Sequence, residues 1–312
     1  MASRARVAIL AARLAGGAML TACVAVAASA PSSAASVTRP AAVAAAAAPS
    51  RVATGPSGVQ AEEAAIANAA TGRVLWSREL NTERPMASIT KVMTALVVIR
   101  AGDLGRRITV PAAVIGYVRA HDASSAGLRP GDILTASQLL YALMLPSGAD
   151  AAYTLAAAYG PGLAAFAAKM NATARALGLT RTHFTNPDGL PYPTGYSTYS
   201  TAASLIKLGL AAMKSAVFRS VADRRSYRIR SGSGHHAYLW QTTNPLLGVY
   251  PGAIGIKTGW TPFAGHCLLF EATRDGRTFI GVNLDSPGVG PAISGADAIR
   301  MLNWAFSHLK LA

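Results

Sequence analysis

Ser88-Ile89-Thr90-Lys91 opens an apolar run, Val92 to Ile99, directly after a loop that contains Pro85. The run predicts a helix that begins near Ser88 and ends near Ala101-Gly102. Residues three positions apart lie on one helical face, so the Lys91 amine would reach the Ser88 hydroxyl. A neighbouring amine can activate a serine as a nucleophile, and a helix start supplies backbone N–H groups for an oxyanion.

The same serine–lysine spacing occurs at Ser204/Lys207 and Ser307/Lys310, so spacing alone does not identify a site. Two further motifs follow in order. Ser147-Gly148-Ala149 lies at a break between two predicted helices, and Lys257-Thr258-Gly259, the only such tripeptide in the sequence, precedes a predicted hairpin. The glycine permits close backbone approach, and the lysine and threonine can bind an anionic group.

Composition predicts an ordered globular body with an alanine-rich appendage, because 51% of the 312 residues are hydrophobic and 14% are charged. The net charge is +15, and the five arginines of residues 1–51 leave +10 on the rest. A basic body favours an anionic environment such as membrane headgroups or an acidic wall polymer, with a merely solvated arginine-rich surface as the alternative. No basic stripe interleaved with aromatic residues indicates nucleic acid.

Residues 1–30 are typical of an export signal, either a signal peptide or a lipoprotein signal. Three arginines precede the short apolar segment Leu14–Ala22. Ala28-Ser29-Ala30 fits a signal peptidase site, whereas Leu20-Thr21-Ala22-Cys23 resembles a lipoprotein box that would attach the protein to a membrane through Cys23. Both predict export to the extracellular, cell-wall or periplasmic side. No later stretch reaches 18 uninterrupted apolar residues, so no second span is expected.

Residues 31–57 are rich in Ala, Pro and Ser and are expected to form a disordered linker, so that residues 58–312 form the folded domain. An early hairpin and late strands with a final helix predict one antiparallel sheet built from both ends of the chain. The expected strands are 64–68, 73–76, 226–230, 266–273 and 278–285, and the expected later helices are 135–145, 149–159, 163–177, 200–213 and 293–309.

The order Ser-x-x-Lys, Ser-x-x, Lys-Thr-Gly is the motif set of penicillin-binding proteins and serine β-lactamases. The sequence from Pro85 to Ala95 resembles the nucleophile region of D-alanyl-D-alanine carboxypeptidases, the low-molecular-mass penicillin-binding proteins. Further matching segments are Leu143–Gly148, Leu177-Gly178-Leu179, Thr182-His183-Phe184, Asn244–Leu247 and Gly255–Gly259. The resemblance covers roughly residues 58–310. The family's additional C-terminal β-domain and membrane anchor are expected to be absent.

The resemblance implies an α/β (α+β) fold of the β-lactamase/transpeptidase-like type, with a central antiparallel sheet, flanking helices and a mostly helical subdomain. It implies a serine-type carboxypeptidase acting on peptidoglycan stem peptides that end in D-Ala-D-Ala, with β-lactams as covalent inhibitors and no cofactor. By matching position, the catalytic residues would be Ser88 as nucleophile, Lys91 as general base and Ser147 as proton relay.

Substrate binding is expected at the third motif and the residue after it. Lys257 and Thr258 would bind the terminal carboxylate, Gly259 would allow close approach, and the backbone N–H groups of Ser88 and Trp260 would form the oxyanion hole. One position departs from the family pattern, because Ala149 stands where an asparagine usually contacts the substrate. We therefore expect weaker or altered activity.

The acids between the second and third motifs argue against a β-lactamase. A β-lactamase needs a deacylating base, usually a glutamate, and residues 151–256 contain none, with Asp188 and Asp223 as the only acids. The remaining alternatives are a D,D-endopeptidase and a catalytically weak protein that binds peptidoglycan or senses β-lactams.

Cysteine and histidine residues give no sign of another site. Cys267 lies in a strand-like run and is expected to be a packed core thiol, and no residue spacing indicates a metal. His183 is expected to be a packing residue, and His235-His236 to lie on a loop surface, because no acid or nucleophile accompanies them in a triad pattern.

Overall fold

The structure is a computed structural model that describes residues 55–308. The expected export signal and residues 31–54 of the expected linker lie outside the described residues, as do residues 309–312. Among residues 55–308, no helix combines the length and apolarity needed to cross a bilayer.

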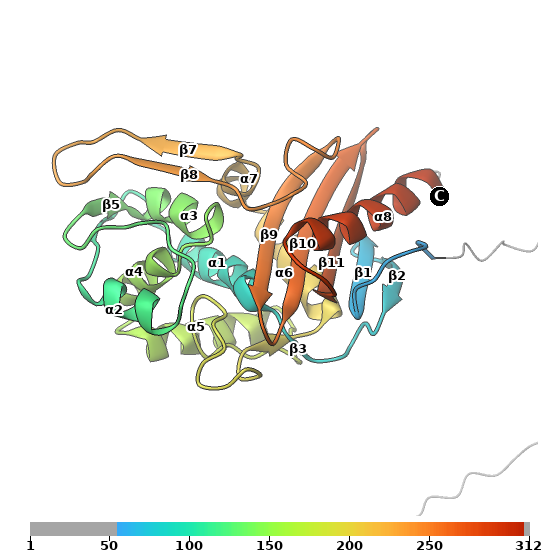
Figure 1. Cartoon of the computed structure of the whole chain (residues 1–312), viewed down its shortest axis with the longest axis horizontal. Coiled ribbons are helices and arrows are strands. Elements are labelled where there is room, and N and C mark those ends of the chain that lie inside the picture. The colour runs from blue at the N-terminus through green and yellow to red at the C-terminus, as the bar shows by residue number, and fades with distance from the viewer. Residues whose placement is uncertain (1–54, 309–312) are drawn as a thin grey trace, which may run out of the picture. The chain divides into compact units, whose positions relative to one another are not determined.

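A five-stranded antiparallel sheet, in the order β2-β1-β11-β10-β9, forms the centre of the fold (Figure 1). Its strands are β1 Glu63–Asn68, β2 Val74–Arg78, β9 Ala253–Thr261, β10 Gly265–Arg274 and β11 Arg277–Ser286. Ile66 in β1 pairs with Gly281 in β11, which joins the early hairpin to the late strands. The predicted sheet from both ends of the chain is therefore confirmed.

The late hairpin turns between the predicted strands 266–273 and 278–285. Arg274 pairs with Arg277, and the two residues between them, Asp275 and Gly276, have φ values of 50° and 71°. Positive φ at both central positions is the geometry of a type I′ turn, which matches the right-handed twist of the strands and favours Asp-Gly.

The two faces of the sheet are covered by different helices. Leu268 and Phe270 of β10 belong to the apolar cluster that includes α8 (Ala292–His308). Cys267 and Leu269 belong to a second cluster, which includes α6 (Ala202–Met213). This alternation follows from the two-residue period of a strand.

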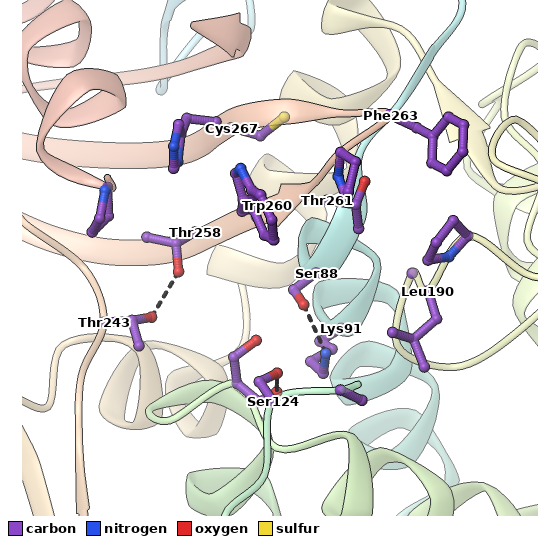
Figure 2. A pocket seen from close by; sticks show the side chains of 18 of the residues that line it. Ser88, Lys91, Ser124, Leu190, Thr243, Thr258, Trp260, Thr261, Phe263 and Cys267 are labelled. Atoms are coloured by element: carbon purple, nitrogen blue, oxygen red, sulfur yellow. Dashed lines mark hydrogen bonds between the residues drawn. The ribbon is translucent and has the colours of Figure 1, made fainter. Parts of the chain in front are cut away.

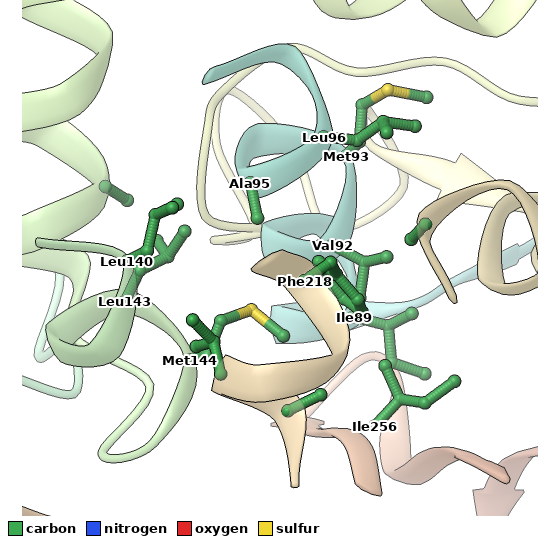
Figure 3. Packing of buried hydrophobic residues seen from close by; sticks show 14 of the residues in the cluster. Ile89, Val92, Met93, Ala95, Leu96, Leu140, Leu143, Met144, Phe218 and Ile256 are labelled. Carbon is green, nitrogen blue, oxygen red and sulfur yellow. The ribbon is translucent and has the colours of Figure 1, made fainter. Parts of the chain in front are cut away.

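Helix α1 (Lys91–Ala101) is the central element of the helical subdomain. Its first eight residues are all buried, as expected of a helix that is apolar on every side. It contacts α3 (Ala136–Met144), α4 (Ala149–Tyr159), α5 (Leu163–Ala176), α6 and α7 (Ala216–Ala222). Figure 3 shows side chains of α1, α3 and α7 meeting Ile256 of β9 in this core.

Several predicted helix limits are confirmed. Helix α3 begins after Thr135, whose hydroxyl accepts from the Gln138 N–H while the Gln138 side chain accepts from the Thr135 N–H. Helix α4 has the predicted bounds, and α5 ends just before Gly178, which has a φ of 68°.

Other expectations needed correction. Helix α6 begins two residues later than predicted, because Tyr199–Ser200 forms a strand, β6, that pairs with β3 (Arg84–Pro85). The predicted strand from Ser226 is present as β7 (Ser226–Ile229), but it pairs with β8 (Tyr238–Gln241) in a separate hairpin. Elements not predicted are β3, β4 (Arg107–Thr109), β5 (Ile133–Thr135), β6, β8, β9, α2 (Ala113–Ala120) and α7.

Candidate active site

Ser88 lies in a single 3₁₀ turn, η1 (Ala87–Thr90), that leads directly into α1. The Lys91 Nζ donates to Ser88 Oγ at 2.8 Å, so the spacing predicted from the sequence brings the amine to the hydroxyl. The preceding residue, Ala87, has a φ of 46°, an unfavourable value for alanine. Backbone strain of this kind persists only where the surrounding structure enforces it.

Lys91 is 1% exposed, and its amine also donates to the backbone carbonyl of Asp188 at 3.1 Å. Burial lowers the pKa of Lys91 to about 8, and the carboxylates of Asp188 and Asp150 oppose this shift. With this pKa the amine holds a much larger neutral fraction at physiological pH than a lysine in water does. Lys91 is therefore suited to accept a proton from Ser88.

Asp188, whose carbonyl contacts Lys91, is held in place by hydrogen bonds to its carboxylate. Its carboxylate accepts from the Tyr117 hydroxyl at 2.9 Å and from the Leu190 N–H at 3.3 Å. It is 1% exposed and does not line the pocket above Ser88. Asp188 therefore tunes the charge of Lys91 and is not positioned to activate a water in the pocket.

The second motif lies between α3 and α4. Ser147 has a φ of 64°, lines the pocket and accepts, through its carbonyl, from the Ser124 hydroxyl at 2.6 Å. The Ala149 N–H donates back to the Ser124 carbonyl at 2.8 Å. Ala149 is 1% exposed and is not among the lining residues. Ser124 thus holds this motif in place, a role that no sequence pattern indicated.

Asp150, the next residue, anchors the loop that carries Ser124. Its carboxylate accepts from the Ser125 hydroxyl at 2.6 Å and from the Ala126 and Leu128 N–H groups at 2.9 and 3.0 Å. It also occupies the first turn of α4, where the helix dipole favours a negative charge.

The third motif lies on β9, the strand at one edge of the sheet. Thr258 and Trp260 are two residues apart on β9 and both line the pocket, whereas Lys257, which directly precedes Thr258, is buried and does not line it. The Lys257 Nζ donates to the Thr258 carbonyl at 3.2 Å and to Thr258 Oγ1 at 3.3 Å. Burial, and secondarily the charge of Lys91, lowers the pKa of Lys257 well below its ordinary value.

Gly259 allows β9 to pass directly against the turn that holds Ser88. A Cβ at this position would lie 2.8 Å from the Met86 carbonyl oxygen and 3.3 Å from the Ser88 nitrogen. A side chain would therefore force the two segments apart. The close approach places the Trp260 and Ser88 backbones beside one pocket.

One pocket of about 690 Å³ brings the three motifs together. Figure 2 shows Ser88 and Lys91 below Trp260, with Thr258 on the strand beside them. Of the residues predicted for the site, those that line the pocket are Ser88, Lys91, Ser147, Thr258, Gly259 and Trp260. Neither of the other two serines with this spacing, Ser204 and Ser307, lines it.

Several pocket residues were not predicted. Thr243 Oγ1 lies 2.7 Å from Thr258 Oγ1, which gives the pocket two adjacent hydroxyls (Figure 2). Thr243 directly precedes Asn244–Leu247, a segment that resembles the carboxypeptidase family. This position was the available sign in the sequence that Thr243 belongs to the site. The rim also exposes the aromatic rings of Trp260 and Phe263, which are 58% and 46% exposed.

The remaining candidate residues lie outside this machinery. Cys267 is buried, as predicted, and its thiol donates to the Ala264 carbonyl at 3.2 Å, although it also lines one wall of the pocket. The expectation that His183 is a packing residue was wrong. His183 is exposed, and its backbone forms an isolated β-bridge with Tyr199. His236 lies on a loop as predicted but bonds to Asp132. In the part of the chain that the structure describes, no three His, Cys, Asp or Glu side chains gather as a metal would require.

Comparisons with known proteins agree with this geometry. The sequence pattern of the peptidase S11 family, described as D-alanyl-D-alanine carboxypeptidase, matches residues 49–288. The D-alanyl-D-alanine carboxypeptidase of Streptomyces sp. strain K15 is 42% identical over 252 residues, which are 77% of this chain and 85% of that protein. The carboxypeptidase DacB2 of Mycobacterium tuberculosis is 40% identical over 220 residues, 70% of this chain and 73% of that protein.

Solved structures give the same result for the fold. The crystal structure of the Streptomyces K15 DD-transpeptidase has a TM-score of 0.76 at 39% identity and covers 81% of this chain and 99% of that one. The expected β-lactamase/transpeptidase-like fold is therefore confirmed. A lysine-paired serine in a shared pocket, a matching sequence pattern and a matching fold establish that this chain belongs to the D-alanyl-D-alanine carboxypeptidase family of serine peptidases.

Proposed function

We propose that the protein cleaves the terminal D-alanine from peptidoglycan stem peptides through an acyl-enzyme on Ser88. Ser88 Oγ attacks the carbonyl carbon of the penultimate D-alanine, a serine ester forms, and the C–N bond to the last D-alanine breaks. Water then hydrolyses the ester and restores the serine. The observation that carries this proposal is the 2.8 Å contact between Lys91 Nζ and Ser88 Oγ inside the pocket.

Lys91 is the proposed general base. A lysine in water would be almost wholly protonated at neutral pH, but burial lowers the pKa of Lys91 to about 8. The neutral amine takes the Ser88 proton as the new bond forms. Ser147, which lines the same pocket, is proposed to pass a proton to the nitrogen of the departing D-alanine.

The terminal carboxylate of the substrate is proposed to bind at Thr258. The Thr258 and Thr243 hydroxyls are adjacent in the pocket, and Lys257 donates to Thr258 from behind. A carboxylate bound at Thr258 would favour the protonated form of Lys257, whose charge would then reach the anion through the Thr258 hydroxyl. This proposal gives Lys257 an indirect part, since its side chain does not line the pocket.

The backbone N–H groups of Ser88 and Trp260 are proposed to stabilise the oxyanion of the tetrahedral intermediate. The close packing that Gly259 permits between β9 and the Ser88 turn supports this role. Donors fixed by the backbone need no rearrangement as charge develops, which is why such sites contribute strongly to rate.

β-Lactams are proposed to acylate Ser88 and to be released slowly. Hydrolysis of a penicilloyl ester needs a base beside the ester. Asp188 is bonded to Tyr117 and does not line the pocket, and Asp122, an acid that does line it, is exposed to solvent. Slow release makes these compounds inhibitors, in contrast to their rapid turnover by β-lactamases.

Export of the protein is also proposed, on the basis of the arginines and apolar segment within residues 1–30. The proposed boundaries are a signal to residue 30, a linker to residue 57 and the catalytic domain from residue 58. Attachment to a membrane through Cys23 is part of this proposal only if the lipoprotein site is used.

Labelling with a fluorescent penicillin tests the nucleophile. We expect the wild type to be labelled and Ser88→Ala to remain unlabelled, while Ser204→Ala, which removes a serine with the same spacing to a lysine, keeps full labelling. Labelling of Ser88→Ala at the wild-type rate would overturn the assignment.

Product analysis then separates the alternatives. Release of D-alanine from a peptide ending in D-Ala-D-Ala supports the carboxypeptidase. Cleavage of cross-linked dimers without such release would identify an endopeptidase. Labelling without either product would identify a binding or sensing protein, the alternative that the missing asparagine at Ala149 favours.

A further inference from the structure

The hairpin of β7 and β8 forms an arm that lies along the outside of the helical subdomain (Figure 1). Its inner face is aromatic and packed. Tyr227 of β7 stacks on Tyr141 of α3 at a ring separation of 3.8 Å and on Trp240 of β8 at 6.2 Å. The Trp240 Nε1 donates to the Ala126 carbonyl at 2.8 Å. These contacts hold one face of the arm against the body of the protein.

The tip of the arm is also fixed. The Gly234 carbonyl accepts from the Ile133 N–H at 2.7 Å, and His236 Nδ1 lies 2.8 Å from Asp132 Oδ1. Tyr238 donates its hydroxyl to the same carboxylate. The arm is therefore bonded to the body of the protein at its tip as well as along its inner face, which leaves its outer face toward solvent.

The outer face of the arm is basic. The exposed residues of the two strands are Ser226, Arg228, Leu239 and Gln241, and Arg230 continues the same face just after β7. Arg228 pairs with Leu239 across the strands, so no acid lies opposite Arg228.

More arginines extend this face at both ends. Arg224 is exposed just before β7, and the Arg107 guanidinium reaches to within 3.6 Å of the Cβ position of Gly234 at the tip. We name the four arginines of this surface the basic arm: Arg107, Arg224, Arg228 and Arg230. Within residues 55–308, none of the four forms an ion pair with an acid.

The charge imbalance is local. Between Asp188 and Glu271 the sequence contains eight lysines and arginines but a single acid, Asp223, and three of the eight, Arg224, Arg228 and Arg230, belong to the basic arm. A surface with so much unpaired positive charge produces a potential that attracts polyanions. Guanidinium groups are the side chains best suited to phosphate, because they can donate two parallel hydrogen bonds to its oxygens.

We propose that the basic arm binds a linear phosphate-bearing polymer of the bacterial cell wall. The basic arm is long and narrow, and its arginines lie along its length, so it fits a chain with regularly spaced phosphates. A membrane surface fits less well, because Leu239 is the one apolar side chain exposed on the outer face of the arm and offers little to insert into lipid.

The arm is joined to the pocket by a very short segment. Strand β8 ends at Gln241, and Thr243, two residues later, bonds to Thr258 inside the pocket. A polymer bound to the arm would therefore hold the pocket at the wall surface, where peptide substrates occur at high local concentration. The proposal concerns attachment and stands independently of the chemistry at Ser88.

Binding of fluorescently labelled poly(glycerol phosphate), measured by anisotropy over a series of salt concentrations, tests the proposal. We expect Arg228→Gln/Arg230→Gln to raise Kd at least about tenfold at 0.1 M salt and to reduce the slope of log K against log salt by about 1.5, the loss of two phosphate contacts. Arg228→Lys/Arg230→Lys, which keeps both charges, should retain most of the affinity.

The matched control is Arg73→Gln/Arg175→Gln, which removes the same charge from exposed positions outside the arm. It should change Kd less than about twofold. Every variant keeps the same N-terminus, so the arginines of residues 1–51 contribute equally. Equal losses in the arm and control variants would overturn the proposal, because net charge alone would then explain binding.

Two further measurements complete the test. Binding to vesicles of phosphatidylglycerol and phosphatidylcholine, without binding to the polymer, would assign the arm to a membrane and overturn the proposal. If Arg228→Gln/Arg230→Gln fails to fold by its thermal unfolding curve, Arg107→Gln/Arg224→Gln removes charge from both ends of the arm instead. Release of D-alanine from a soluble peptide should be unchanged in all arm variants, which separates this inference from the proposed function.

Discussion

Lys91 Nζ donates to Ser88 Oγ at 2.8 Å from a position that is 1% exposed to solvent. Because burial lowers the pKa of Lys91 to about 8, its neutral fraction rises as the pH increases through that value. A general base works only in its neutral form, so kcat/KM for a D-Ala-D-Ala peptide should rise tenfold per pH unit below about pH 8 and level off above it. A pH–rate profile between pH 5 and 10 measures this rise, the acidic limb of the profile.

Asp188→Asn should shift the acidic limb of the kcat/KM profile to lower pH. The Asp188 carboxylate raises the pKa of Lys91, so removing its charge favours the neutral amine at a lower pH. Asn retains an acceptor for the Tyr117 hydroxyl, which limits structural change. The control is Asp275→Asn in the exposed turn of the late hairpin, which should leave the profile unchanged. An unshifted limb in Asp188→Asn would show that Lys91 does not set the profile.

Gly259→Ala should abolish most of the acylation by β-lactams. The added Cβ would lie 2.8 Å from the Met86 carbonyl oxygen, so β9 must move away from the Ser88 turn. Displacing one oxyanion donor typically costs about 100-fold or more in rate, and we expect a loss of that size in the rate of fluorescent-penicillin labelling. Gly116→Ala in α2 is the control, because nothing lies within 4 Å of its Cβ position. Normal labelling of Gly259→Ala would contradict the proposed close approach.

Much of the fold could be predicted because its signals are local. The Asp275-Gly276 turn, the Thr135 cap and the glycine after α5 each act over a few residues, and the structure has an element boundary at each. Strand β9 was missed because its sequence contains Gly255, Gly259 and a lysine, residues that are not typical of strands. Its strand conformation comes from pairing with β10, which no local pattern reports.

The site residues, too, could be predicted only where a local motif contains them. Ser88, Ser147 and Thr258 belong to recognisable motifs and were predicted to meet, and all three line one pocket. Ser124 and Thr243 carry no motif of their own, because their importance comes from partners distant in the sequence, 23 and 15 residues away. The indirect placement of Lys257 also required the structure, since it depends on which face of β9 the side chain occupies.

Ala149→Asn should increase acylation and change selectivity. Ala149 opens α4 next to the pocket residue Ser147 but is buried and does not line the pocket, so only a longer side chain from this position, such as that of asparagine, could carry an amide to the substrate peptide. One additional hydrogen bond contributes about 0.5–1.5 kcal/mol, so we expect roughly a three- to tenfold rise in kcat/KM for D-Ala-D-Ala peptides. Ala176→Asn at the exposed end of α5 serves as the control. If both variants leave acylation and turnover unchanged, the missing asparagine does not limit this enzyme.

Thr243→Val should weaken binding of the substrate carboxylate. The substitution keeps the shape of the side chain but removes the hydroxyl that lies 2.7 Å from Thr258 Oγ1 in the pocket. Loss of one hydrogen bond to a charged group costs about 1.5–3 kcal/mol, which predicts at least a tenfold fall in kcat/KM, mainly through KM.

Thr273→Val provides a matched control for Thr243→Val. Thr273 Oγ1 lies 2.8 Å from Thr278 Oγ1 at the hairpin end of β10 and β11, so this variant breaks an equivalent threonine pair outside the pocket. It should leave kcat/KM unchanged, although the thermal unfolding midpoint of either variant can fall. The decisive comparison uses a substrate whose terminal carboxylate is amidated. Both the wild type and Thr243→Val should process that substrate equally poorly, because the group that Thr243 helps to bind is gone. A tenfold difference between them on the amidated peptide would mean that Thr243 acts on another part of the substrate.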